Sequence, residues 1–195
     1  MARSSDATAA APPGKRERLI RSAANLVYRQ GIPATTLAQV AADADVPLGN
    51  VYYYFKTRDD LIAAVVESRQ NEIVELIERL NTRAEPLDRL RGLAESWTDV
   101  ADQVTLYGCP IGGLTAELCK HAGPDADGRR VLFETLIDWV TDQFAELGDA
   151  EPRERAQSLI ARIQGTALLA CAFNDRQLLD REFRRIANDL SSAGS

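Results

Sequence analysis

The chain has 195 residues, a net charge of −6 at neutral pH, 45% hydrophobic residues and 27% charged residues. These proportions are close to those of folded globular domains, which excludes wholesale disorder, and no apolar run is long enough for a membrane span. The N-terminal segment MARSSDATAAAPPG lacks the apolar stretch that a secretory signal requires. We therefore expect a cytoplasmic protein with no membrane partner and a flexible tail over residues 1–13.

Basic residues are concentrated at the start of the chain. Residues 1–56 hold seven Lys and Arg against four Asp and Glu, whereas residues 57–195 hold 16 against 25. This asymmetry indicates that the N-terminal part meets a polyanion while the remainder has another role. Four basic residues crowd the first expected turns of helix: Lys15, Arg16, Arg18 and Arg21. Acidic residues would suit the helix dipole better there, so these four either form a solvated face or face phosphates.

Apolar residues recur at three- and four-residue spacing through nearly every segment, and alternating strand-like runs are nearly absent. This periodicity predicts an all-α protein of about nine helices. The first helix is expected to end at Gly31, because glycine commonly closes helices. Thr36 followed by Gln39, and Thr57 followed by Asp60, match the pattern of side chains that cap a helix N-terminus.

The segment between these two caps predicts a pair of short helices joined by a tight turn, which is a helix-turn-helix. The turn falls at residues 45–47, where Asp45 tolerates a left-handed conformation and Pro47 suits the start of a helix. The second short helix is expected over residues 48–55. This helix carries the residues that face outward.

Tyrosines crowd the second short helix. Val51 and Phe55 lie one turn apart and can both point into a small core. The residues between them, Tyr52, Tyr53 and Tyr54, must then spread over the remaining surface, with part of one ring buried. Exposed tyrosines offer hydroxyl groups to phosphate oxygens and rings to thymine methyl groups, so the pattern indicates a DNA-recognition helix.

Residues 35–66, TTLAQVAADADVPLGNVYYYFKTRDDLIAAVV, closely resemble the DNA-binding region of the TetR family of bacterial transcriptional repressors. The resemblance reaches back to about Lys15 and covers the first third of the chain. Asp45 and Pro47 replace the glycine and the serine or threonine that are usual in the family, which stiffens the turn and removes a side-chain cap. By the resemblance, the DNA-contacting positions are Thr36, Leu48, Gly49, Asn50, Tyr52, Tyr53, Tyr54, Lys56 and Arg58. Tyr52, Tyr54 and Arg58 would mainly meet phosphates.

The resemblance also implies a division of the chain into two domains. Residues 14–74 would form the DNA-binding domain, with its motif at about residues 36–55, and residues 75–195 the effector-binding and dimerisation domain. Short breakers rich in Gly and Pro divide the second region into roughly five further helices.

The last two expected helices carry apolar stripes that we interpret as a dimer surface, with a glycine and several alanines that allow close helix approach. An ordinary intrachain core explains the same periodicity, so this alternative stays open. The residues expected at the dimer interface are Leu159, Ile163, Gly165, Ala167, Leu179, Phe183 and Ile186.

A small-molecule effector is expected among the middle helices, in a mostly apolar pocket with few polar groups. Aromatic residues at helical spacing also occur in ordinary cores, so core packing is the competing interpretation. The candidate lining residues are Trp97, Tyr107, Cys109, Leu114, Phe133, Trp139 and Gln164.

Cys109 precedes Pro110, a residue favoured in the first turn of a helix, and is therefore predicted as an N-cap. Backbone amides at that position stabilise a thiolate, so Cys109 is a candidate for sensing electrophiles or oxidants; a small structural cap is the alternative. With Cys119 and Cys171 the cysteines are odd in number and lack a CxxC spacing. We therefore predict neither a disulfide framework nor a metal site, and no cofactor.

The sequence thus predicts a homodimeric transcriptional regulator, in the first instance a repressor, that binds a palindromic double-stranded DNA operator and is released by a small-molecule effector. The alternative is the same regulator triggered by modification of Cys109. An enzyme with Cys109 as nucleophile and His121 as base is disfavoured, because this histidine is the only one in the chain and no acid–base constellation accompanies it. A helical adaptor is disfavoured because exposed tyrosines would then have no role.

Overall fold

The computed structural model describes residues 13–121 and 128–192, which form ten helices and no strands. The helices are α1 (Lys15–Ala34), α2 (Leu37–Asp43), α3 (Leu48–Tyr54), α4 (Arg58–Asn81), α5 (Pro86–Asp99), α6 (Ala101–Tyr107), α7 (Pro110–His121), α8 (Gly128–Glu146), α9 (Pro152–Phe173) and α10 (Arg176–Ser192). The all-α class is confirmed. The described ranges contain one helix more than expected, because the chain leaves helical geometry at Val100 and so separates α5 from α6. The predicted tail lies outside the described residues except for Pro13.

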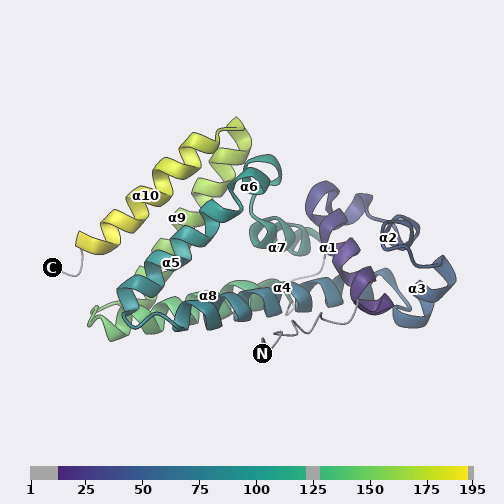
Figure 1. The fold of residues 1–195 in the computed structure, drawn as a ribbon, viewed down its shortest axis with the longest axis horizontal. Helices are drawn as coiled ribbons and strands as arrows, with labels where there is room; N and C mark the ends of the chain where they lie inside the picture. Colours follow the sequence, from purple (N-terminus) through teal and green to yellow (C-terminus); the bar gives the residue numbers. More distant parts are fainter. Residues whose placement is uncertain (1–12, 122–127, 193–195) are drawn as a thin grey trace, which may run out of the picture.

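Helix α4 joins the two ends of the molecule (Figure 1). Helices α1, α2 and α3 gather at one end, α5, α9 and α10 at the other, and α4 runs alongside α8 between them. Helix α4 packs against α1 near its start and against α5 and α8 further along. It crosses the expected domain boundary at residues 74–75 without interruption. None of the helices in the described ranges is long and apolar enough to cross a membrane.

Helix α1 changes direction at Gly31, where the sequence predicted its end. Gly31 has φ +83° and ψ 164°, which interrupts the helical path before the last turn. A side chain at this position would also meet α7, since an added Cβ atom would lie 2.5 Å from Glu117 Oε1. The left-handed backbone and the close carboxylate together require a glycine here.

The predicted caps on either side of the helix-turn-helix are confirmed. Thr36 Oγ1 accepts a hydrogen bond from the Gln39 amide at 3.3 Å, and Gln39 Oε1 accepts one from the Thr36 amide at 2.9 Å. Thr57 and Asp60 make the same reciprocal pair at 3.0 and 2.9 Å. Between the caps Asp45 has φ +51°, the left-handed conformation expected for the turn. The caps fix the starts of α2 and α4, and therefore the position of α3 between them.

Six of the seven residues expected at the dimer surface are already covered within one chain, which favours the alternative of an intrachain core for them. The six side chains are each at most 8% exposed within a single chain: Leu159, Ile163, Ala167, Leu179, Phe183 and Ile186. Helix α10 packs on α5 and α9, and the Phe183 ring stacks on Trp97 with centroids 6.1 Å apart. Apolar periodicity identifies the buried face of a helix, but not whether the covering helix belongs to the same chain. Of the seven, Gly165 alone is exposed.

We expect Gly31→Ala to lower the free energy of unfolding by about 1–2 kcal/mol, because a residue with a Cβ atom is strained at a positive φ. The nearby Glu117 carboxylate would add to this loss. Gly113→Ala is the matched control: an added Cβ atom would meet nothing within 4 Å, and the residue lies inside α7. That change should stabilise by about 0.5–1 kcal/mol. Urea denaturation followed by circular dichroism measures both, and equal stabilities would contradict the role of Gly31.

Candidate functional site

Helix α3 exposes the tyrosines that the sequence placed on an outer face. Val51 and Phe55 are 0% and 3% exposed, whereas Tyr52 and Tyr53 are 50% and 76% exposed. A helix this short cannot bury every face, so burial of Val51 and Phe55 directs two tyrosine rings into solvent. Tyr54 is half-buried against the core and meets the Tyr53 ring edge to face, with centroids 5.0 Å apart. The partial burial of one ring is therefore as expected.

The N-terminal end of α3 leaves room for another molecule to come close to its backbone. Leu48 is 42% exposed, an added Cβ atom at Gly49 would meet nothing within 4 Å, and Asn50 is half-buried. No side chain caps α3 after Pro47, which confirms the missing cap expected from the sequence. Thr36 is exposed at the start of α2, which packs against α3. One helix pair therefore presents a hydroxyl, an amide and an uncrowded backbone.

The two basic residues beyond α3 have different partners. Lys56 is exposed, and its ammonium group donates to the Tyr52 carbonyl at 3.1 Å. Arg58 donates to the Ile32 carbonyl, so it links the start of α4 to the end of α1. Arg58 is nevertheless exposed, and its guanidinium group has five N–H donors, which leaves donors for phosphate oxygens.

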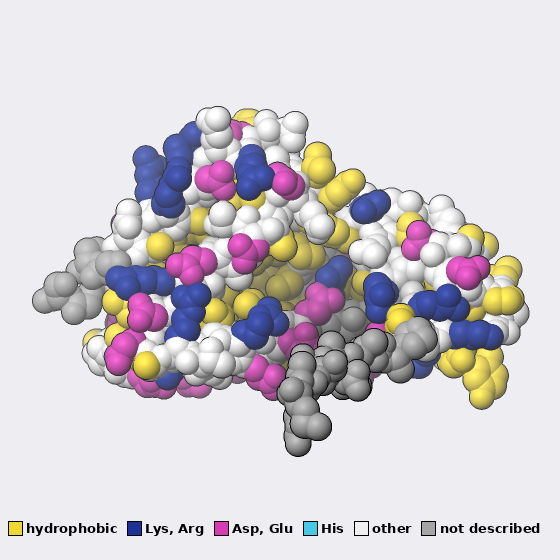
Figure 2. Space-filling view, in the orientation of Figure 1, with side chains coloured by type: hydrophobic (Ala, Val, Ile, Leu, Met, Phe, Trp, Pro, Cys, Tyr) yellow, Lys and Arg dark blue, Asp and Glu magenta, His cyan; other side chains and the backbone are white. Residues whose placement is uncertain are grey.

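Basic residues at the start of α1 help to hold the helix-turn-helix together. Arg16 lies over the Phe55 ring, 5.7 Å from its centroid, and Arg18 donates to the Asp45 carbonyl at 3.2 Å. Arg21 pairs with an acidic residue of its own helix. Lys and Arg side chains and projecting hydrophobic side chains occur together at this end of the molecule (Figure 2). The basic cluster of α1 is therefore more than a solvated face.

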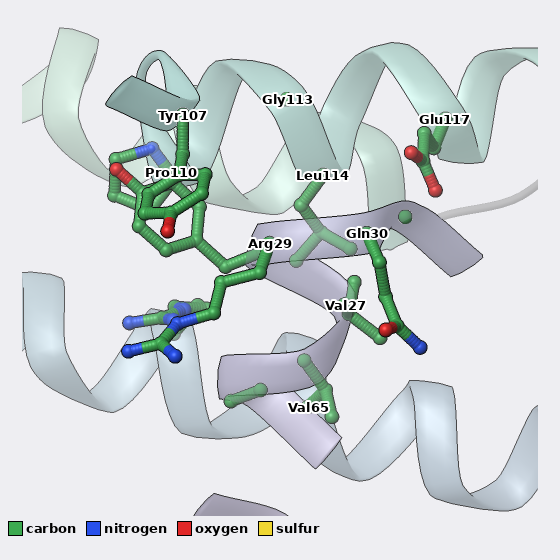
Figure 3. A pocket seen from close by; sticks show the side chains of 13 residues that line it. Val27, Arg29, Gln30, Val65, Tyr107, Pro110, Gly113, Leu114 and Glu117 are labelled. Atoms are coloured by element: carbon green, nitrogen blue, oxygen red, sulfur yellow. The ribbon is translucent and has the colours of Figure 1, made fainter. Parts of the chain in front are cut away.

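A cavity of about 300 Å³, the interface pocket, lies where α1 and α4 meet α6 and α7 (Figure 3). Tyr107 and Leu114 line one side of it, and Val27 and Arg29 the other. The full lining is Ala24, Val27, Tyr28, Arg29, Gln30, Gly31, Val65, Arg69, Tyr107, Pro110, Gly113, Leu114 and Glu117. Ionisable and apolar side chains are therefore mixed in its walls.

Two polar contacts connect α1 to the opposite wall of the interface pocket. The Tyr28 hydroxyl donates toward two carbonyl oxygens, 3.0 Å away at Gln103 and 2.8 Å away at Gly108. Burial raises the pKa of Tyr28 to about 12, so the phenol remains a donor at neutral pH. The Glu117 carboxylate of α7 accepts a hydrogen bond from the Ile32 amide, directly after the break in α1. Both α6 and α7 therefore restrain α1.

A second cavity of about 240 Å³, the apolar pocket, lies between α4, α5, α7 and α8. A hollow with a hydrophobic floor opens in the central part of the molecule in Figure 2. The residues that line the apolar pocket are Arg69, Glu72, Ile73, Leu76, Arg79, Leu93, Ser96, Trp97, Val100, Pro110, Ile111 and Leu136. Arg69 and Pro110 line both cavities, so the two adjoin at these residues.

The residues expected at an effector pocket divide between these cavities and the core. Trp97 lines the apolar pocket, while Tyr107 and Leu114 line the interface pocket. Four others line neither: Cys109, Phe133, Trp139 and Gln164. The indole N–H of Trp139 donates to Asn81 Oδ1 at 2.9 Å, which fixes the end of α4. The place of these four residues at an effector pocket stays a prediction.

Cys109 is the N-cap of α7, as predicted, because its sulfur accepts a hydrogen bond from the Gly112 amide at 3.2 Å. The expectation of a stabilised thiolate is wrong. Cys109 is 7% exposed, and burial raises the pKa of its thiol. The hydrogen bond from the Gly112 amide opposes that shift without overcoming it. The thiol form therefore predominates at neutral pH.

The ionisable side chains of the interface pocket were missed by sequence reasoning. Arg29, Arg69 and Glu117 come from α1, α4 and α7, and no spacing along the chain relates them. The one local signal was Gly31, whose break brings the end of α1 to Glu117.

A segment near the N-terminus, which spans most of α1 to the first part of α4, matches a known family. The family described as bacterial regulatory proteins, tetR family, matches residues 19–65. An uncharacterized HTH-type transcriptional regulator in the lacX 3′ region of Lactococcus lactis subsp. lactis is 25% identical over 92% of this chain and 94% of its own. Escherichia coli NemR, named an HTH-type transcriptional repressor, is 23% identical over 91% of this chain and 94% of its own.

Solved structures share the whole fold. A TetR transcriptional regulator from Legionella pneumophila has a TM-score of 0.80 at 16% identity, over 91% of this chain and 98% of its own. The reduced form of Escherichia coli NemR has a TM-score of 0.78 at 20% identity, over 89% of this chain and 95% of its own. Residues 19–65 therefore carry the DNA-binding region of the tetR family of bacterial regulatory proteins, as the sequence resemblance implied. The chain is a DNA-binding, helix-turn-helix transcription regulator.

The burial of Cys109 predicts an order of thiol reactivity. Cys119 is exposed, whereas Cys109 is buried with a raised thiol pKa, so iodoacetamide at pH 7.5 should alkylate Cys119 faster. We expect a rate difference of about tenfold or more, since one pKa unit alone changes the thiolate fraction tenfold. Peptide mass spectrometry over a time course measures each site. Faster alkylation of Cys109 would contradict the assignment and favour a sensing thiol.

Proposed function

We propose that the protein is a homodimeric repressor that binds a near-palindromic DNA operator through α3 and is released by a small-molecule effector. The observation that carries the DNA-binding part is the exposure of Tyr52 and Tyr53 above a fully buried Val51 and Phe55. The apolar residues of this helix pack into the core and fix its position, while its polar groups face solvent and are free to contact a partner. The name of NemR, an HTH-type transcriptional repressor, supports repression as the direction of regulation.

The proposed DNA contacts follow from the exposure of each side chain. Gly49 and Asn50 at the start of α3 would approach base edges, because recognition helices place their N-terminal residues in the major groove. Tyr53, the most exposed ring, would contact a base edge or a thymine methyl group. The remaining proposed contacts, mainly with phosphates, are Thr36, Leu48, Tyr52, Tyr54, Lys56 and Arg58. Residues 14–74 would then form the DNA-binding domain and residues 75–195 the effector-binding and dimerisation domain.

The proposed dimer forms through the outer face of α9. Leu168, Leu169 and Phe173 are 68%, 48% and 69% exposed, although they are large and apolar. Exposed Gly165 and Ala172 extend this stripe with small side chains that allow another helix to approach. Exposed apolar side chains clustered on one helix face are typical of an interface. A twofold dimer would then present two copies of α3 to the two halves of an operator.

The proposed effector acts by preferring one conformation of the protein. A ligand shifts an equilibrium only by its difference in affinity for the two states, so it must bind better to the form that no longer fits the operator. The interface pocket and the apolar pocket support this proposal, because both border α4, which packs against α1 and therefore connects them to the helix-turn-helix.

The second candidate is the same regulator triggered by modification of Cys109. The cap position of Cys109 and the shared fold with NemR, whose structure is of a reduced form, favour it. The burial of Cys109 and its raised thiol pKa oppose it. Cys109→Ser keeps a capping oxygen and removes the thiol, so a variant that ignores oxidants which release the parent from DNA would establish the thiol mechanism.

The DNA-binding proposal predicts that residues of α3 set sequence preference while Lys56 sets salt dependence. On an operator selected from random duplexes, Tyr53→Ala and Asn50→Ala should change the preferred base at defined positions. Tyr53→Phe tests whether the hydroxyl or the ring reads the base. Lys56→Ala should weaken operator and random duplexes alike and lower the slope of log affinity against log salt by about 0.9. Fluorescence anisotropy at several salt concentrations measures each effect.

Arg184→Ala is the control for loss of a positive charge, because Arg184 is exposed on α10, remote in the fold from α3. It should leave both preference and salt slope unchanged. Equal losses on operator and random DNA for all the α3 variants would contradict the proposed roles.

The dimer proposal predicts that charge on the outer face of α9 separates the subunits. Leu168→Glu and Phe173→Glu should raise the dissociation constant of the dimer by about tenfold or more, because each places a carboxylate in an apolar contact. Gly165→Trp should do the same by steric hindrance while leaving the fold intact, since the space beside Gly165 is empty within one chain. Analytical ultracentrifugation at micromolar concentration measures the association.

Leu147→Glu is the matched control, because Leu147 is also a large exposed apolar residue, 42% exposed, but lies after α8 and away from the α9 stripe. It should leave the dimer unchanged. A dimer that survives all three α9 substitutions would place the interface on another surface.

A further inference from the structure

The interface pocket is built from helices of both proposed domains. Val27 and Arg29 come from α1, which packs on the helix-turn-helix, and Leu114 and Glu117 come from α7 (Figure 3). A molecule bound here would touch the proposed DNA-binding domain and the proposed effector domain at once. A ligand in the interface pocket would therefore directly affect the relative orientation of these two proposed domains.

The walls of this pocket carry more positive than negative charge available to a ligand. Arg29 is exposed, lies 5.9 Å from the centroid of the Tyr107 ring, and forms no ion pair with any carboxylate of the described residues. Arg69 is largely buried, with its side chain 16% exposed, and pairs with Glu72 at 2.6 Å. The Glu117 carboxylate is already engaged by the Ile32 amide. An anion in the pocket could therefore pair with the guanidinium group of Arg29, and the largely buried guanidinium group of Arg69 lines the same pocket.

The interface pocket lies next to the apolar pocket. Arg69 and Pro110 line both the interface pocket and the apolar pocket, so the two adjoin at these side chains. Beyond them the apolar pocket offers Trp97, Leu93 and Ile111. Glu72 and Arg79 also line the apolar pocket, but most of its lining is hydrocarbon. An arginine-containing pocket beside a mostly apolar one matches a ligand that has a single anionic end and an apolar body.

We propose that the adjoining pockets bind an amphipathic organic acid, with its carboxylate held by Arg29 and Arg69 and its apolar body directed past Pro110 toward Trp97. A monoanion fits better than inorganic phosphate, because Glu117 in the same wall would repel a second negative charge. The aromatic ring of Tyr107, already beside Arg29, would cover the carboxylate end.

The consequence for regulation rests on the function proposed above. Pairing of a carboxylate with Arg29 and Arg69 would draw α1 toward α4. Gly31, which lines the same pocket, directly precedes the Ile32 peptide that Glu117 and Arg58 hold. If the acid prefers the conformation released from DNA, operator DNA must weaken binding of the acid by the same factor.

The test uses the full-length protein and isothermal titration calorimetry at pH 7.5. The probes are a series of ω-phenylalkanoates from three to eight carbons in the chain, their neutral amides, and inorganic phosphate. We expect at least one carboxylate to bind about tenfold or more tightly than its amide, since a desolvated ion pair contributes that much. Phosphate should bind more weakly than that carboxylate.

Two kinds of variant locate the site. Arg29→Gln and Arg69→Gln should reduce affinity for the carboxylate to that for the amide, whereas the charge control Arg184→Gln should leave it unchanged. Gly113→Leu keeps both arginines and fills the interface pocket, because Gly113 lines it and an added Cβ atom there would meet nothing within 4 Å. This variant should fold normally and lose binding of the carboxylate.

Several outcomes would overturn the proposal: equal affinities of acid and amide, phosphate binding as tightly as the acids, no binding by any probe, or full binding by Arg29→Gln and Gly113→Leu. Operator binding is measured separately without any acid. A protein that binds its operator and ignores every acid overturns this inference alone, whereas one that binds the acids through Arg29 but no duplex overturns the proposed function alone.

Discussion

The peptide of Ile32 is the point on which the arrangement of the two ends of the molecule depends. The break at Gly31 interrupts the regular hydrogen bonding of α1 at Ile32, and a buried backbone group needs a partner. The Ile32 carbonyl accepts from the Thr35 amide as well as from a side chain. Glu117 of α7 accepts from the Ile32 amide, and Arg58 of α4 donates to the Ile32 carbonyl. Ile32 therefore connects α1 to both α7 and α4. A shift of α7 would therefore move the Ile32 peptide and, through Arg58, the start of α4, which directly follows α3.

Helix α4 carries that connection through the molecule. Its start is fixed by the reciprocal cap of Thr57 and Asp60, and its end by the bond between Asn81 and the Trp139 indole. Between these points it packs on α1, α5 and α8 and places Arg69 in the walls of both pockets. A helix capped at one end and anchored at the other moves as a unit, so the same element serves both proposed domains. This explains why no linker separates them.

Local chemistry made the N-terminal part predictable from the sequence. Thr36, Thr57 and Asp45 act on backbone groups a few residues away, and the burial of Val51 with Phe55 follows from helical spacing alone. The C-terminal part was less predictable, because an apolar stripe shows which face of a helix is buried but not which helix covers that face. The stripes of α9 and α10 cover α5 and each other, and the outward residues Leu168 and Phe173 were not singled out. Cys109 shows the same limit: its cap was readable, but its burial, which decides its pKa, depends on packing.

The location of the cavities follows from the different tasks of the helices. The helix-turn-helix must keep its shape to read DNA, and it does so with reciprocal caps and a fully buried Val51. The junction between α1, α4 and α7 is held instead by a few polar contacts around unfilled space, so rearrangement there disrupts little close packing. A ligand at this junction would act on the orientation of α1 directly and would require no chain of intermediate residues. The interface pocket is therefore placed where a bound molecule would change the fit to DNA with little disturbance of the helix-turn-helix itself.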